Sequence, residues 1–368
     1  VAAHYLLTSI FLYLFLSSLS LRRSAAVLGA LVFTYGGYLT SYPPLQTAVL
    51  EVSTWLPLAL LCASRFAQTR RTRHLALAAL VLVIAFFAGH PQTFVYVALI
   101  TLAYFAFRAR LAGWKFAAFA SGAAALVTLT SALAAAQLLP SLQFVLNSDR
   151  ASVSFAEVSA GFAFVDVLQF LLTGFVSRWH PLYVGILPLG LAAFAIARSK
   201  NPEVRFWVIV ALISLVLAFG AKAAAFDAAY WLVPGLRFFR GPERLALGVS
   251  FALAVLAALG AHHLFGPLAR RDRHSLARLI CIGAVLFGGT FALLGVSHIL
   301  SRLGLDPSDW QRFPDRAGVL TLGVGLALTS LLVRARVPSL RAWLPALCVS
   351  AAVLDLFAAN RPMNVIPP

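Results

Sequence analysis

The chain alternates long apolar stretches with short polar clusters. A helix needs about 20 mostly apolar residues to cross the hydrocarbon core of a membrane. By this rule we predict twelve spanning helices, at 4–21, 24–41, 45–64, 75–89, 92–108, 114–138, 182–198, 204–220, 244–265, 276–299, 317–333 and 341–359. The pattern therefore predicts an all-α fold, a polytopic integral membrane helix bundle with about 11–12 transmembrane helices.

Basic residues are concentrated in alternate loops of this predicted bundle. The loops after the odd-numbered spans hold 19 of the 29 Lys and Arg residues, with only two acids, Glu203 and Asp272. The other connections and the C-terminal end hold ten basic and ten acidic residues. By the positive-inside rule the arginine-rich face is cytoplasmic. We therefore predict a multi-pass protein of the bacterial plasma (inner) membrane, with both ends of the chain outside.

Three predicted outer loops are long, at about 142–181, 221–243 and 300–316. They hold most of the acids, tryptophans and prolines outside the spans, so we expect them to be structured and to carry the chemistry. The whole of 1–368 reads as a single transmembrane domain. Because an outside N-terminus is unusual in such proteins, we expect a first helix and first outer loop upstream of Val1. Any C-terminal extracytoplasmic domain is likewise expected beyond Pro368.

Composition excludes several classes of protein. The chain is 61% hydrophobic and 11% charged, with a mean hydropathy of +0.90, which excludes a large soluble enzyme. The net charge of +17 is spread over short clusters between apolar stretches, so no nucleic-acid partner is expected. No metal site or cofactor is predicted, because the three cysteines lack ligand spacing and the common nucleotide, zinc-protease and hydrolase motifs are missing. A requirement for a divalent cation stays open.

Two outward turns carry candidate catalytic residues. Glu51 lies about one turn inside the outer end of its span, where an ionised carboxylate must face a wet cavity or the bundle interior. It is a candidate general base or cation ligand; alternatively, it is an interfacial glutamate that reaches outward. His90 in the turn Gly89-His90-Pro91-Gln92 has an ordinary pKa near neutrality, so it is a candidate for moving protons or donating to a phosphate oxygen. Gln92 is a candidate ligand of a sugar hydroxyl, whereas the simpler reading of this turn is a helix end.

The segment 234–244, Pro-Gly-Leu-Arg-Phe-Phe-Arg-Gly-Pro-Glu-Arg, gives the strongest signal. Arg237, Arg240 and Arg244 lie on the outer face, where topology does not call for positive charge. Pro242 suits the first turn of the next helix, whose N-terminus attracts anions. Guanidinium groups bind phosphate in a bidentate way. We therefore predict a phosphate-binding site that includes Glu243; the alternatives are an Arg/Phe belt on lipid headgroups, or a local Arg244–Glu243 pair.

Four stretches together resemble the YfhO-type bacterial membrane proteins, relatives of the GT-C glycosyltransferases. They are Gly89-His90-Pro91-Gln92, Gln137-Leu138-Leu139-Pro140, the segment 183–189 (Tyr-Val-Gly-Ile-Leu-Pro-Leu) and the arginine segment from Leu236 to Arg244. The resemblance implies a protein that takes a sugar from a polyprenyl-phosphate carrier. It implies transfer to a cell-envelope glycan or polymer on the extracytoplasmic face.

One departure from that family affects the expected mechanism. GT-C enzymes usually place their catalytic acid in the first outward loop, which our topology puts upstream of Val1, and Glu51 is the nearest substitute. A second hypothesis is therefore a transporter or flippase of lipid-linked saccharides, in which the same arginines guide the phosphate without chemistry. A third is a structural membrane subunit. The expected partners are the lipid-linked sugar donor, the polymer acceptor and membrane lipids.

Overall fold

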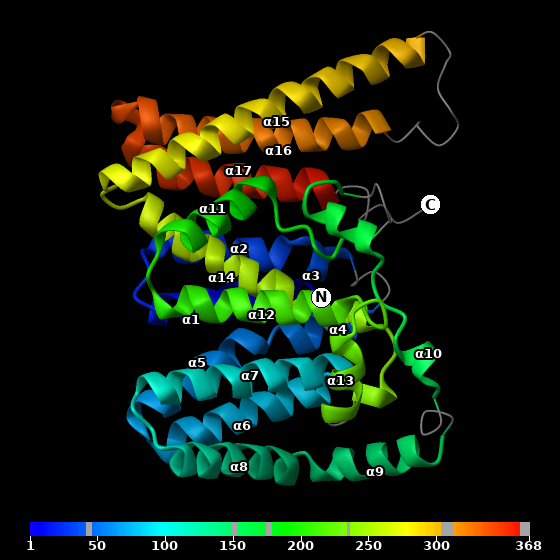
Figure 1. Cartoon of the computed structure of the whole chain (residues 1–368). Coiled ribbons are helices and arrows are strands. Elements are labelled where there is room, and N and C mark those ends of the chain that lie inside the picture. Colours follow the sequence, from blue (N-terminus) through cyan, green and yellow to red (C-terminus); the bar gives the residue numbers. More distant parts are fainter. Residues whose placement is uncertain (42–45, 149–152, 174–178, 234–235, 303–312, 361–368) are drawn as a thin grey trace. The chain divides into compact units, whose positions relative to one another are not determined.

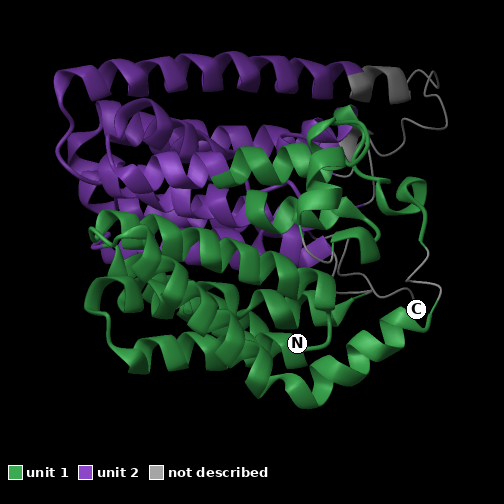
Figure 2. Ribbon diagram, turned by 60° about the horizontal axis from the view of Figure 1, so that its bottom comes forward, with its two compact units in different colours: residues 1–19, 45–164, 210–249 green, residues 20–44, 165–209, 250–368 purple. Residues whose placement is uncertain are grey.

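The computed structural model describes residues 1–41, 46–148, 153–173, 179–233, 236–302 and 313–360 (Figure 1). Within these ranges the regular structure is helical, and the β pairing is a single isolated bridge between Ala160 and Gly220. The predicted all-α membrane helix bundle is confirmed. The backbone divides into two compact units, each built from three separate stretches of chain (Figure 2). Unit 1 comprises 1–19, 45–164 and 210–249, and unit 2 comprises 20–44, 165–209 and 250–368.

Seven helical segments of the described chain are long and apolar enough to cross a membrane. They are Thr47–Thr69, Pro91–Leu111, Phe116–Leu133, Pro242–Leu264, Arg270–Val296, Arg316–Arg336 and Pro338–Asn360. Each coincides with one of the twelve predicted spans. The other five predictions fall on shorter helices, namely α1 (Ala2–Ser18), α2 (Arg23–Tyr35), α6 (Thr72–Phe87), α11 (Ile186–Arg198) and α12 (Pro202–Ala218). The chain therefore has the helices of a multi-pass membrane protein.

Unit 1 is a bundle around α5 (Leu56–Thr69) and α7 (Pro91–Leu111), which pack against each other. Helix α1 packs on α5, α6 packs on α5 and α8 (Phe116–Leu133), and α4 (Thr47–Ser53) packs on α7 (Figure 1). The remaining elements are α9 (Ala135–Leu146), α10 (Phe155–Val158), α13 (Ala225–Leu232) and the 3₁₀ turns η3 (Leu236–Phe238) and η4 (Pro242–Leu245). Helix α9 runs past the predicted end of its span, and several of its large apolar side chains are exposed.

Aromatic packing fixes one end of unit 1. The Trp114 indole donates to the Ala67 carbonyl over 2.8 Å, and the Arg70 guanidinium lies 4.8 Å from the centre of the Trp114 ring. Phe66 and Phe105 pack on the same ring. The α5–α6 and α7–α8 turns therefore lie together, as expected for two loops on one side of a membrane.

Unit 2 packs α17 (Leu344–Asn360) against α2 and against α16 (Phe313–Arg336), which also contacts α11 and α15 (Arg270–Arg302) (Figure 1). The short elements α3 (Gly37–Ser41) and η6 (Pro338–Trp343) contact α17. Helices α12 and α14 (Ala246–Leu264) contribute residues to both units. Helix α15 exposes large apolar side chains, including Val285 at 76% and Phe291 at 62%. Such a continuous apolar surface suits acyl chains rather than water.

Helical elements occupy parts of the predicted outer loops in the described chain. Helix α9 occupies the start of 142–181, and residues 160–162 lie against 218–220 through the bridge and a Phe162–Ala218 backbone hydrogen bond. Helix α15 extends to Arg302 and α16 starts at Phe313, so most of the predicted loop 300–316 lies outside the described residues.

Candidate functional site

The arginine segment begins with a sharp turn that positions Arg244. Gly241 has a φ of +74°, in the left-handed region that glycine tolerates best. An added Cβ there would lie 2.5 Å from Arg244 Nη1, so the site also needs the space that glycine leaves. Pro242 opens η4 directly after Gly241, which confirms the predicted helix start. Arg244 therefore sits in the first turn of a membrane-length helical segment.

Two glutamines from distant parts of the sequence hold the Arg244 guanidinium. Nη2 donates to Gln46 Oε1 over 3.2 Å, and Nη1 donates to Gln92 Oε1 over 3.3 Å and to the Arg240 carbonyl over 3.0 Å. The Gln92 amide in turn donates to the Gly241 carbonyl (3.1 Å) and to the Tyr96 hydroxyl (2.9 Å). Because α4 packs on α7, the residues that begin these helices meet at one end of unit 1. We call Gln46, Gln92 and Arg244 the arginine cage.

The acceptors of the arginine cage are all neutral. Arg244 forms no ion pair with a described carboxylate, but the neighbouring Glu243 carboxylate interacts electrostatically with it, and both side chains lie beside Gly241. Arg244 is half-buried, and its Nε is buried without an acceptor. A partly desolvated cation whose hydrogen-bond partners are neutral attracts an anion. Three of the Arg244 N–H groups already donate to protein oxygens. The guanidinium therefore does not have the free pair of N–H groups that the predicted bidentate contact with a phosphate would need.

Arg240 and Arg237 are exposed and differently placed. Arg240 Nη2 lies 3.1 Å from Glu157 Oε1, with both side chains 51% exposed. Glu157 belongs to a capping box with Ser154 at the start of α10, which fixes its position. The Arg237 guanidinium lies 5.0 Å from the centre of the Phe238 ring. Exposed contacts of this kind contribute little free energy, so both guanidinium groups can turn to another anion.

His90 caps the N-terminus of α7. Its Nδ1 accepts the Thr93 backbone N–H over 3.2 Å and lies 2.8 Å from Thr93 Oγ1, which places the ring proton on Nε2. Burial, and then the nearby Arg244 charge, lower the pKa of His90 from 6.5 to about 4. The expectation of a histidine poised near neutrality needs correction, because His90 is neutral at pH 7. Its Nε2–H remains a suitable donor to a phosphate oxygen.

Glu51 lies on α4, about one turn beyond Gln46, and is half-buried. It forms no hydrogen bond or ion pair with a described residue. The structure thus brings together Gln92, Arg240, Arg244 and the neighbouring His90, and leaves Glu51 as a separate carboxylate on the helix that supplies Gln46.

A polar cluster in unit 2 was not predicted. Asp355 is buried on α17 and accepts the Tyr183 hydroxyl over 2.5 Å and the Ile186 backbone N–H over 2.8 Å. One turn further along α17, Asn360 Oδ1 lies 2.8 Å from both His180 Nε2 and Thr40 Oγ1. The sequence signal that could have indicated this cluster is the carboxylate of Asp355, which lies inside the predicted span 341–359.

No family model, curated protein or solved structure matches this chain. The likeness to YfhO-type proteins accordingly stays a prediction that rests on four short motifs. In the described part of the chain, no three His, Cys, Asp or Glu side chains gather as a metal site.

Proposed function

We propose that this multi-pass membrane protein is a GT-C-like glycosyltransferase, which binds a polyprenyl-phosphate-linked sugar at the arginine cage. The observation that carries the proposal is the half-buried Arg244 guanidinium, which two glutamines orient without neutralising. A phosphate is the anion that best matches guanidinium geometry. We place this end of unit 1 on the extracytoplasmic face of a bacterial plasma membrane, where the sugar passes to a cell-envelope polymer.

Each residue has a role in this proposal. Arg244 supplies fixed positive charge, while the exposed Arg240 and Arg237 close on the phosphate from the aqueous side. The His90 Nε2–H donates to a phosphate oxygen. Glu51 accepts the proton of the acceptor hydroxyl as its oxygen bonds to the anomeric carbon of the sugar. The bond from that carbon to the phosphate oxygen breaks, and the electron pair stays on the polyprenyl phosphate, whose charge the arginines stabilise.

Binding of a short-chain polyprenyl-phosphate sugar to purified protein in detergent tests the site. Arg240→Lys and Arg244→Lys keep the charge but lose the planar fork, so each should weaken binding by about 1.5–3 kcal/mol per charged hydrogen bond removed. Arg70→Lys is the matched control, because this arginine contacts the Trp114 ring at the other end of unit 1. Equal affinities of all four proteins would reject the phosphate site and favour a general belt of charge.

Glu51→Gln separates the transferase from a flippase. Loss of a positioned base costs about 10²–10⁴ in rate, whereas the neutral isostere leaves donor binding intact. We expect the variant to bind the donor like the wild type and to keep less than about a tenth of the turnover. If turnover persists, Glu51 is not the base. If the wild type moves the lipid-linked sugar across a vesicle membrane without transferring it, the flippase hypothesis replaces the transferase.

A further inference from the structure

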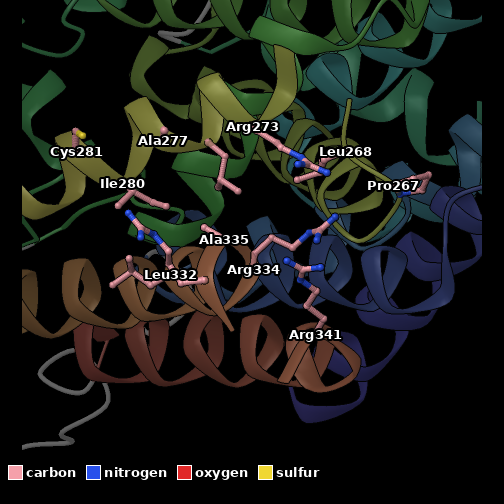
Figure 3. Close-up of a pocket in the computed structure, with 12 residues that line it drawn as sticks. Pro267, Leu268, Arg273, Ala277, Ile280, Cys281, Leu332, Arg334, Ala335 and Arg341 are labelled. Carbon is pink, nitrogen blue, oxygen red and sulfur yellow. The ribbon is translucent and has the colours of Figure 1, made fainter. Parts of the chain in front are cut away.

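Unit 2 contains a pocket of about 480 Å³ between the beginning of α15, the end of α16 and η6 (Figure 3). Four of its lining residues are arginines, from three different elements: Arg273, Arg334, Arg336 and Arg341. The other lining residues are mostly apolar, and none is acidic. The pocket therefore combines four positive charges with an otherwise apolar lining.

Arg334 is fixed at the wall of this pocket. Its Nε donates to the Leu264 carbonyl over 2.9 Å, and its Nη2 donates to the Gly266 carbonyl over 2.7 Å. These carbonyls belong to the last residue of α14 and to the turn after it, and they are neutral acceptors, so no charge of opposite sign neutralises the guanidinium. Arg273 and Arg341 lie close enough to repel that charge, as Figure 3 shows for their converging side chains.

The nearest acid does not compensate the pocket. Asp272 precedes Arg273, but its carboxylate binds Arg198 Nε over 2.7 Å and lies 3.6 Å from His263 Nε2. It also accepts the Ala269 backbone N–H. No described carboxylate pairs with the four pocket arginines. Like charges held around one cavity are unfavourable, so an external anion would stabilise the arrangement.

The surroundings of the pocket are those of a membrane interface. Leu332 lines it and is 37% exposed, while Ile282, which follows the lining residue Cys281 on α15, is 56% exposed. Trp343 on η6 is 70% exposed, and tryptophan is typical of the headgroup level of a membrane. A soluble anion would use only the arginines, whereas a phospholipid would use the arginines and the exposed apolar side chains together.

We propose that this pocket binds the phosphate group of an anionic phospholipid, whose acyl chains lie on the exposed apolar sides of α15 and α16. The positive-inside rule needs only basic residues in the loop, not four guanidinium groups around one cavity. The site lies in unit 2 and does not depend on the proposed glycosyl transfer. By our topology it faces the cytoplasmic leaflet.

The test compares two double variants with the same loss of charge. Arg273→Gln with Arg341→Gln removes two pocket arginines and leaves Arg334 in place to bind its carbonyls. Arg271→Gln with Arg278→Gln removes two exposed arginines of the same helix that do not line the pocket. Phosphatidylglycerol retained on each purified protein is measured by native mass spectrometry, with phosphatidylcholine as the neutral comparison. If the double variant does not give a monodisperse protein, the single variants Arg341→Gln and Arg278→Gln replace the two pairs.

We expect the pocket pair to lose at least about tenfold more phosphatidylglycerol affinity than the control pair, since short charged hydrogen bonds add to the long-range attraction. Equal losses in the two pairs, or no loss in either, would overturn the proposal. Glycerol phosphate should displace the bound lipid poorly, because it lacks acyl chains. Efficient displacement by this soluble phosphate would show a site for a free anion instead, and would also overturn it.

Discussion

Arg244 in unit 1 and Asp355 in unit 2 are charged side chains with neutral hydrogen-bond partners, but they differ in what they leave unsatisfied. In unit 1, Arg244 is half-buried, its partners are amide and carbonyl oxygens, and exposed arginines flank it. In unit 2, Asp355 is buried, and two strong donors from residues 183–186 satisfy it. The first arrangement keeps positive charge available to a ligand. The second ties a connecting segment to α17, so a buried charge alone does not identify a binding site.

The largest effect is expected from removing the unit 2 carboxylate. Asp355→Ala leaves the Tyr183 hydroxyl and the Ile186 N–H without an acceptor, and each unsatisfied buried group costs about 1–3 kcal/mol. The free energy of unfolding in detergent should therefore fall by about 2–6 kcal/mol. Asp227→Ala, at an exposed position of α13, should change it by less than about 0.5 kcal/mol. Similar stabilities of the two variants would contradict a structural role for Asp355.

The next prediction replaces a neutral hydrogen-bond partner of Arg244 by a carboxylate. Gln92→Glu keeps the side-chain shape but places a carboxylate about 3.3 Å from Arg244 Nη1. Two opposite charges at about this distance attract each other by roughly 1 kcal/mol in bulk water and roughly 4 kcal/mol near a protein surface. Donor affinity should fall at least tenfold, roughly 1.4 kcal/mol. The stability should also fall, because a carboxylate cannot donate to the Gly241 carbonyl as the Gln92 amide does. Gln143→Glu on the exposed α9 is the control, and equal affinities of the two variants would show that Arg244 does not bind the anion.

Local sequence determined the helices and the beginning of the site. Apolar length alone predicts the long segments, and Gly241-Pro242 predicts where the helix of Arg244 starts, because both depend on neighbouring residues. The role of Gln46 was not predictable, because it depends on α4 packing against α7. Burial and the Arg244 charge, also tertiary effects, lower the His90 pKa. Asp355 was predictable in principle, since a carboxylate within an apolar span is itself a signal.

A third prediction concerns acid, which acts on unit 1 through His90. The folded-state pKa of about 4 lies below the ordinary value of 6.5, so on acidification the unfolded chain binds the proton first. The stabilising contribution of neutral His90 is thus complete above about pH 6.5 and declines as the pH falls toward about 4. His90→Asn preserves an N-cap residue and removes the titration. On acidification the wild type should therefore lose more unfolding free energy than His90→Asn does. If the two proteins show the same dependence of unfolding free energy on pH, the lowered pKa is contradicted.

The smallest effect on stability is expected at the exposed Arg240–Glu157 pair. Glu157→Gln removes a contact between side chains that are both about half exposed, and exposed pairs contribute about 0.2–1 kcal/mol. Stability should change by no more than this, and less at high salt, because mobile ions screen the pair. Donor affinity should rise, because Arg240 no longer has to give up its contact with the Glu157 carboxylate before it binds the phosphate. Thermal unfolding and donor binding at low and high salt measure the two effects, with Asp227→Asn as the control for a general loss of negative charge. A weaker affinity in Glu157→Gln than in this control would mean that Glu157 positions Arg240 for the anion, and the arginine cage would then extend to α10.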